Sequence, residues 1–286
     1  MWNQVKTVFL LASITGVLVV VGGVYGGRFG MIAGLAIGAV MNLGAWWKSD
    51  SLVRAMTGAQ IVPHGSMPEL HAMVEELALR AQIPKPQLLY VDDPTPNAFA
   101  TGRSPQRAAV AVTRGLVQTL DERELRGVLA HEFAHIIQRD TLISALTATL
   151  AGAITMLANM AQWAAIFGGG RDEDGQHPIA LMATAFLAPI AALLIQMAIS
   201  RTREYRADAT GARLAQDPLA LASALERIDQ VAQRQAQHGI MHDNPSTAHL
   251  MIHGLNFGGL RQLFATHPPM AERVRRLRAM ASQPLR

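Results

Sequence analysis

Four stretches of the chain contain no Asp, Glu, Lys or Arg, and each is long enough to cross a lipid bilayer, which requires about 20 apolar residues. They cover residues 7–27, 29–47, 141–170 and 175–200. Half of all residues are hydrophobic and only 16% are charged, whereas a soluble domain carries about 25% charge. The sequence therefore predicts four transmembrane helices, arranged as two hairpins, with the lipid bilayer as a partner.

The charges that flank these stretches predict their orientation. Lys6, Lys48 and Arg54 border the first pair, whereas the loop between the third and fourth stretches carries three acidic residues (172–174) against one Arg. Cytoplasmic loops of membrane proteins are enriched in Lys and Arg, so we expect this acidic loop to be external. The expected organisation is a transmembrane hairpin over 1–48, a cytoplasmic part over 49–140, a second hairpin over 141–200 and a second cytoplasmic part over 201–286.

Residues 121–140, which end where the third stretch begins, have the pattern of a helix. Asp121 followed by Glu124 is a capping-box signature, and apolar residues recur at helical spacing through the segment. The segment contains His131-Glu132-Phe133-Ala134-His135.

Residues four apart stand on the same face of a helix, so His131 and His135 can offer two imidazoles to one metal ion while Glu132 projects beside them. This is the arrangement of zinc proteases. The alternative is a partly exposed helix with two surface histidines. The chain has no Cys, which excludes thiolate ligands and leaves His, Asp and Glu as metal donors.

A third ligand is expected where the chain returns to the same side of the membrane after the fourth stretch. Glu204 lies four residues beyond Ser200, at nearly the same height as His135. Two His and one Glu, with water in the fourth position, form a catalytic zinc site. Asp208 follows Glu204 by one turn and is expected to accept the ring N–H of His131. Taken by itself, Glu204 is better explained as a solvated charge among arginines, but its position two spans after the histidine pair favours ligation.

The chemistry expected of such a site is peptide hydrolysis, with Glu132 as the general base. His267 is the candidate donor to the oxyanion, with Tyr205 and Arg203 behind it. Residues 87–91 predict a short strand, and residues 97–101 and 108–112 predict a small antiparallel sheet around a turn at 102–106. Its edge, formed by Asn97, Ala98, Phe99 and Ala100, can hold an extended peptide substrate. A purely structural hairpin is an equal alternative.

The net charge of +4 is spread thinly over the chain, and no nucleic-acid-binding module is present in the sequence, so we expect no nucleic-acid partner. The sequence predicts a mainly α integral membrane protein: four transmembrane helices plus a cytoplasmic α+β, zincin-like protease domain.

Several segments, taken in order, resemble the HtpX-type membrane zinc metalloproteases, which are relatives of the CAAX prenyl-protein endopeptidases. They are PNAFATG (96–102), AHEFAHI (130–136), SRTREYRAD (200–208) and THPPMAERVRRL (266–277). The resemblance implies one Zn²⁺ held by His131, His135 and Glu204, with Glu132 as the catalytic base. It also implies a multi-pass protein of the bacterial inner membrane with a cytoplasmic catalytic domain. The implied role is stress response and quality control against misfolded or damaged membrane proteins.

The same resemblance gives importance to His267 and Arg273 in the last of these segments. For Arg273, a structural role in tying down the final helix is an equal expectation.

Two other functions fit parts of the pattern. A metal-binding membrane protein without hydrolysis would give Glu132 no task, and it would need more polar residues within the spans than they contain. A prenyl-protein protease would favour a larger enclosed membrane chamber than four helices can build. We therefore expect a membrane zinc endopeptidase.

Overall fold

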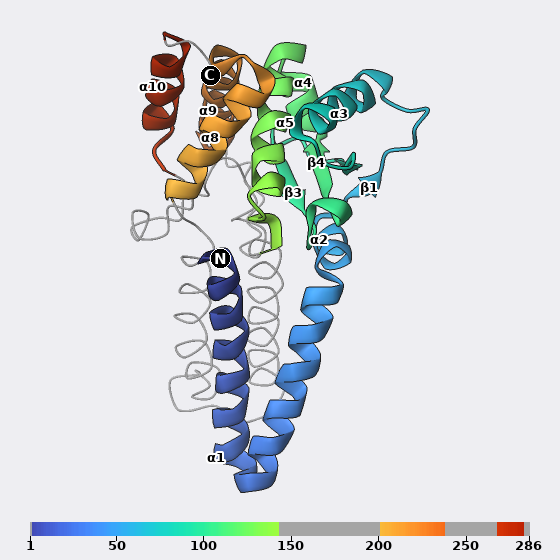
Figure 1. The fold of residues 1–286 in the computed structure, drawn as a ribbon, viewed down its shortest axis with the longest axis vertical. Coiled ribbons are helices and arrows are strands. Elements are labelled where there is room, and N and C mark those ends of the chain that lie inside the picture. The colour runs from blue at the N-terminus through green and yellow to red at the C-terminus, as the bar shows by residue number, and fades with distance from the viewer. Residues whose placement is uncertain (1, 143–200, 238–267, 283–286) are drawn as a thin grey trace.

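The computed structural model of the chain describes residues 2–142, 201–237 and 268–282. In Figure 1 a long helical hairpin extends away from a second part, which contains a small sheet and the remaining helices. Beyond residue 142, the third and fourth predicted spans lie outside the described residues, and so does His267.

The hairpin is formed by α1 (Trp2–Trp47), which reverses direction at Gly27. Gly27 has φ +56° and ψ −141°, a backbone conformation that glycine adopts without the steric cost of a Cβ. The two arms approach closely, since a Cβ at Gly38 would lie 3.0–3.1 Å from atoms of Thr15. The Asn42 amide also donates a hydrogen bond to the Thr15 hydroxyl (2.8 Å). Small and polar residues therefore hold the arms together.

The second arm has the properties of a membrane span. Within the part of the chain that the structure describes, the one helix segment apolar and long enough to cross a bilayer is Gly26–Gly44, with a mean hydropathy of 1.3. Its large apolar side chains point outward: Phe29, Ile32 and Val40 are 80%, 66% and 71% exposed. Such a surface suits lipid rather than water. Four spans remain a prediction.

The sheet has four strands in the order β1-β2-β4-β3, with β3 at one edge. The strands are β1 (Gln60–Ile61), β2 (Gln87–Val91), β3 (Ala98–Thr101) and β4 (Ala109–Thr113). The predicted hairpin is confirmed, because β3 and β4 are antiparallel, with Ala98 opposite Val112. The sheet as a whole is mixed rather than antiparallel as expected, because β2 and β4 are parallel. All five residues of β4 are buried, as a central strand covered on both faces requires.

The two faces of the sheet pack against different parts of the chain. On one face, Val110 and Val112 join a core with Leu129 and Phe133. On the other face, Ala109 and Ala111 pack with Phe99 and with Val53. Val53 belongs to α2 (Ser49–Thr57), which follows the membrane hairpin directly. The sheet is therefore attached to the hairpin by α2.

The helix at the centre of the second part is α5 (Glu122–Ile137), which packs against the sheet and against α3, α8 and α9. The remaining elements are α3 (Pro68–Ala81), the short 3₁₀ helix η1 (Pro105–Arg107), α4 (Arg114–Thr119), α8 (Arg201–Ala215), α9 (Pro218–Gln237) and α10 (Met270–Ala281). The largest set of contacts between two helices joins α5 and α8, so the chain on either side of the second predicted hairpin comes together here.

Candidate metal centre

The predicted helix around His131 is confirmed as α5, and its start has the predicted capping box. The Asp121 carboxylate accepts a hydrogen bond from the Glu124 N–H (2.9 Å), and the Glu124 carboxylate accepts one from the Asp121 N–H (3.1 Å). These bonds satisfy two backbone donors that a helix start leaves unpaired. The Ser223 hydroxyl of α9 donates to Glu124 as well (2.6 Å), which fixes α5 to its neighbour.

Close packing of α8 on α5 fixes the position of Glu204 along α5. Gly211 of α8 lies directly on the backbone of His131, where an added Cβ would be 2.7 Å from the nitrogen and 2.8 Å from the Cα. No larger residue fits there without separating the helices. Glu204, two turns earlier on α8, is thereby held opposite the two histidines.

The three predicted donors converge. The Nε2 atoms of His131 and His135 are 3.2 Å apart. The Glu204 carboxylate lies 3.7 Å from Nε2 of His131 and 3.6 Å from Nε2 of His135. His131 and Glu204 are buried, with 3% and 8% of their surfaces exposed. Among the described residues, these three form the one group of His, Asp and Glu side chains arranged to hold a metal ion.

The spacing of these donors fits a metal ion. A tetrahedral ion bonded to two imidazole nitrogens at 2.0–2.1 Å holds them about 3.3 Å apart, close to the observed 3.2 Å. Two neutral imidazoles cannot both present lone pairs at that distance without a proton or a cation between them. The donor set, two imidazoles and one carboxylate, is also the set found in catalytic zinc sites.

On the far side of each ring, Nδ1 meets a buried carboxylate. Nδ1 of His131 lies 3.0 Å from Oδ1 of Asp208, as the sequence predicted. Nδ1 of His135 lies 3.3 Å from Oδ2 of Asp140, a residue that the sequence analysis did not connect with the site. Asp140 comes close to His135 because the backbone turns back after the end of α5. Asp208 and Asp140 have 3% and 2% of their surfaces exposed.

Arg273 of α10 is also buried, with none of its surface exposed. Its guanidinium donates to both oxygens of Asp208, with Nε 2.8 Å from Oδ2 and Nη2 2.6 Å from Oδ1. Nη1 lies 3.7 Å from the Glu204 carboxylate. Arg273 therefore both ties the last helix down and contacts the groups around the candidate metal site, so the two expectations for it are not exclusive.

These charges shift the acidities of the site. Burial by itself would raise the pKa of Asp208, but the charge and hydrogen bonds of Arg273 outweigh burial and lower that pKa to about 2. Burial would likewise lower the pKa of His135, yet the carboxylates of Asp140, Glu204 and Glu132 raise it to about 9. Without a metal, the site thus binds a proton at His135, which is how a concentrated negative field responds when no other cation is present.

Glu132 lies beside the metal-ligand group and is 5% exposed. Burial raises the pKa of its carboxyl group, partly opposed by the two histidines and by a hydrogen bond from the backbone of Ala100. Ala100 belongs to β3, so the edge strand and Glu132 are in direct contact. A general base with a raised pKa takes up a proton more readily near neutral pH.

The main-chain groups of β3 alternate in direction. Asn97 bonds to β4, since its carbonyl accepts from the N–H of Thr113 (2.9 Å) and its own N–H donates to the Thr113 hydroxyl (2.8 Å). In an antiparallel pair the next residue points its backbone groups the other way. Ala98 and Ala100 therefore direct theirs to the outer edge, beside α5, while the Phe99 side chain packs into the core.

Of the residues expected behind the oxyanion donor, Arg203 lies with Nη1 3.9 Å from Asp140. Tyr205 instead stacks under Arg276, 3.8 Å from the ring centroid. The site therefore brings together His131, Glu132, His135, Glu204, Asp208 and the strand of Ala98 and Ala100.

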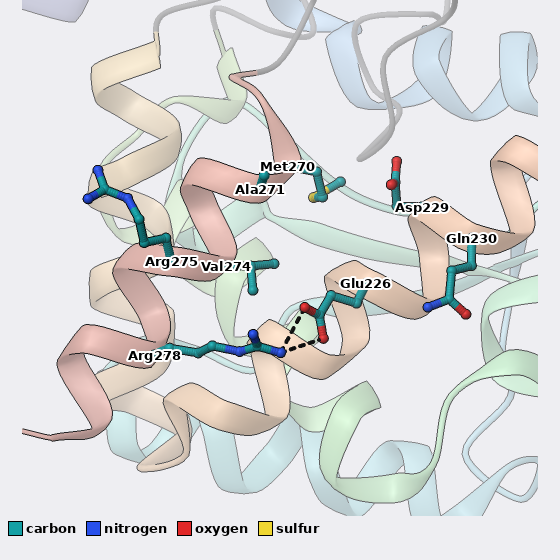
Figure 2. A pocket seen from close by; sticks show the side chains of 8 residues that line it. All are labelled: Glu226, Asp229, Gln230, Met270, Ala271, Val274, Arg275 and Arg278. Carbon is teal, nitrogen blue, oxygen red and sulfur yellow. Dashed lines mark hydrogen bonds and ion pairs between the residues drawn. The ribbon is translucent and has the colours of Figure 1, made fainter.

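A separate cavity of about 480 Å³ lies between α9 and α10. Figure 2 shows its lining, formed by Glu226, Asp229, Gln230, Met270, Ala271, Val274, Arg275 and Arg278. Arg278 forms an ion pair with Glu226 across it (2.8 Å). Its lining does not include Glu132, His131, His135 or Glu204.

Comparison with known proteins agrees with this geometry. Residues 66–281 match peptidase family M48. The protease HtpX homolog of Polynucleobacter necessarius subsp. necessarius (strain STIR1) is 51% identical over 284 residues, which cover 98% of this chain and 97% of that protein. The protease HtpX homolog of Burkholderia mallei (strain SAVP1) is 50% identical over 284 residues, covering 98% of each.

A crystal structure of S. mikatae Ste24p is a more distant match, with 19% sequence identity and a TM-score of 0.49; it covers 96% of this chain and 65% of that one. This chain thus spans less than two thirds of that solved protein. The family match over most of the chain, together with half-identical relatives of nearly equal length, shows that the chain belongs to peptidase family M48, among its HtpX-type membrane metalloproteases.

Proposed function

We propose that the chain is a membrane-bound zinc endopeptidase that hydrolyses misfolded or damaged membrane proteins at the cytoplasmic face of the bacterial inner membrane. The observation that carries this proposal is the convergence of His131, His135 and Glu204 beside a buried Glu132. Family membership supports a metalloprotease. The identity of the metal, the side of the membrane on which the site lies and the class of substrate are our inference.

The donor set favours zinc. Imidazole nitrogens and one carboxylate suit this ion, and the 3.2 Å between the two Nε2 atoms is a separation that a tetrahedral ion would fit. A zinc ion in this position would supply a Lewis acid that acidifies water and polarises a peptide carbonyl.

Glu132 is the proposed general base. Its carboxylate takes a proton from water as the peptide carbonyl is attacked and then delivers that proton to the nitrogen of the departing amine. The hydrogen bond from Ala100 supports this role, because it fixes the direction of the carboxylate. His267 remains the proposed donor to the oxyanion, and it lies outside the described residues.

The outer edge of β3 is the proposed binding place for the substrate backbone. Ala98 and Ala100 direct their main-chain groups there, so an extended peptide can add to the sheet as a further strand next to Glu132. Asn97 and Phe99 support that edge from within, through Thr113 and the core.

The closeness of this edge to the membrane hairpin favours substrates that emerge from the bilayer. The turn after β3 touches the end of α1, with the Arg103 guanidinium 4.4 Å from the centroid of the Trp47 ring. Just beyond the C-terminal end of α5, the Thr141 hydroxyl donates a hydrogen bond to the carbonyl of Gly102 in the same turn (2.8 Å). Both contacts keep the peptide-binding edge close to the segments that enter the membrane.

The test uses the full chain purified in detergent with an unfolded test protein as substrate. Cleavage should stop after chelation and return when Zn²⁺ is added. Glu204→Ala should lose both bound zinc and cleavage, while Glu75→Gln, which alters a 61%-exposed carboxylate, should keep both. Cleavage that survives complete removal of metal would overturn the proposal. To test the substrate class, a destabilised membrane protein should be cleaved faster than its folded form in the same vesicles.

A further inference from the structure

Asp140 reaches the metal site through the backbone turn that ends α5. After α5 ends at Ile137, Arg139 adopts a left-handed conformation with φ +58°, which is unfavourable for a residue with a Cβ. The chain folds back, and the N–H of Asp140 donates to the carbonyl of His135 (2.9 Å). The side chain thereby comes to lie under the His135 ring, 3.3 Å from Nδ1. The same left-handed cap ends α3 at Gln82 and α8 at Gln216, and it is a common way to end a helix. After α5 it brings a carboxylate to a histidine of the metal site.

Arg203 faces Asp140 from α8, the helix that also carries Glu204. Its Nη1 lies 3.9 Å from Oδ1 of Asp140, and only 11% of its side chain is exposed. The order of groups is therefore imidazole, carboxylate, guanidinium. The same order occurs at the other histidine, where His131 is followed by a carboxylate and then by Arg273.

A carboxylate that accepts the Nδ1–H of a histidine has defined effects on its other nitrogen. It fixes the tautomer in which Nε2 carries the lone pair, it orients the ring, and it increases the basicity of the ligand. Removing such a partner costs about 10–100-fold in metal affinity. We propose that Asp140, supported by Arg203, is a positioning residue that holds His135 in the orientation required for metal binding. This inference rests on the metal site proposed above.

A purely structural role is the rival explanation, since Asp140 also ends a helix. Thr141 provides the matched control, because it is the next residue, is equally buried, and directs its hydroxyl to the carbonyl of Gly102. Thr141→Val therefore removes a buried hydrogen bond from the segment that follows α5 and leaves the Asp140 carboxylate in place. Asp92→Asn, at a carboxylate with 77% of its side chain exposed, controls for loss of charge alone.

The experiment titrates the metal-free full chain in detergent with Co²⁺, whose visible absorption reports its ligand geometry, and measures Zn²⁺ affinity by competition. Asp140→Asn, which keeps the shape of the side chain, should weaken both affinities about tenfold and change the Co²⁺ spectrum. Asp140→Ala should weaken them toward 100-fold. Thr141→Val and Asp92→Asn should stay within about twofold of wild type and keep its spectrum.

Unchanged affinity and spectrum in Asp140→Asn, or an equal loss of affinity in Thr141→Val, would overturn the positioning role. Failure of the wild-type chain to bind either metal would instead overturn the proposed metal site itself. Melting temperatures of the metal-free variants show whether each one is folded, and Asp140→Asn decides the question if Asp140→Ala does not fold.

Discussion

Arg273 and Asp208 form a two-pronged ion pair in the interior, with contacts of 2.6 and 2.8 Å and no exposed surface on the arginine. Since Asp208 also lies 3.0 Å from Nδ1 of His131, one guanidinium joins α10 to the candidate metal site. Removing one member of a buried pair leaves the other charge uncompensated.

We therefore expect Arg273→Met to reduce the stability of the protein by about 3–5 kcal/mol and to weaken metal binding. Thermal unfolding and Zn²⁺ affinity, both in detergent, measure the two effects. Arg275→Met is the control, because Arg275 has 75% of its side chain exposed and pairs with Glu272 at the surface. A metal affinity equal to that of wild type in Arg273→Met would show that the pair serves only to attach α10.

Substitution of Gly211 should separate the two helices that carry the metal ligands. A Cβ there would lie 2.7 Å from the His131 nitrogen and 2.8 Å from its Cα, and overpacking of an interior costs about 1–3 kcal/mol. Gly211→Val should therefore lower both the melting temperature and the metal affinity. Gly65→Ala, at a position with no atom within 4 Å of the added Cβ, should change neither. Wild-type metal affinity in Gly211→Val would contradict the role given to this contact.

The pKa of His135 predicts how the metal-free protein responds to pH. Burial lowers this pKa, but Asp140, Glu204 and Glu132 together raise it to about 9, from a usual value of 6.5. The folded protein thus retains a proton that the unfolded chain has lost. This stabilises the fold fully below pH 6.5, and the contribution disappears as the pH rises through 9.

The protonation of His135 contributes at most about 3 kcal/mol to the free energy of unfolding. Measured without metal, the melting temperature of the wild type should therefore decline between pH 6.5 and 9 more steeply than that of His135→Gln. Parallel curves for the two proteins would show that His135 is not protonated in the folded state. Bound Zn²⁺ should remove the difference in slope, because the metal replaces the proton.

The proposed orientation can be tested with single cysteines, because the natural chain has none. Arg28→Cys lies at the turn of the α1 hairpin and Ser282→Cys at the exposed end of α10. In intact cells whose outer barrier is opened, a membrane-impermeant thiol reagent should label Arg28→Cys only. Ser282→Cys should react after the inner membrane is permeabilised. The reverse pattern would place the metal site on the outer face.

Local signals in the sequence were enough to predict α5 and the placement of its two histidines on one face. Asp121 and Glu124 mark its start, and the spacing of His131 and His135 follows from helical geometry. Glu204 could be predicted from topology, since two predicted spans return the chain to the side from which it left. The β3–β4 hairpin was likewise visible as two extended stretches around a turn.

Features that depend on distant contacts were not predictable in the same way. The parallel pairing of β2 with β4 has no local signature, because it results from β4 filling the space between β2 and β3. The contact of Asp140 with His135 is local, but it depends on the left-handed conformation of Arg139, for which Arg gives no signal because Gly or Asn usually takes that position. The burial of Arg273 depends on the packing of α10 against α8, from a distant part of the chain.

The most direct test of the catalytic centre is a paired measurement on Glu132→Gln, in which bound zinc and cleavage of an unfolded protein are determined on the same purified sample. Glu132 is buried beside the three donors but is not one of them. We expect one zinc ion per chain, as in wild type, and a loss of cleavage of at least about 100-fold. Cleavage at the wild-type rate with zinc bound would contradict the role of Glu132 as the general base.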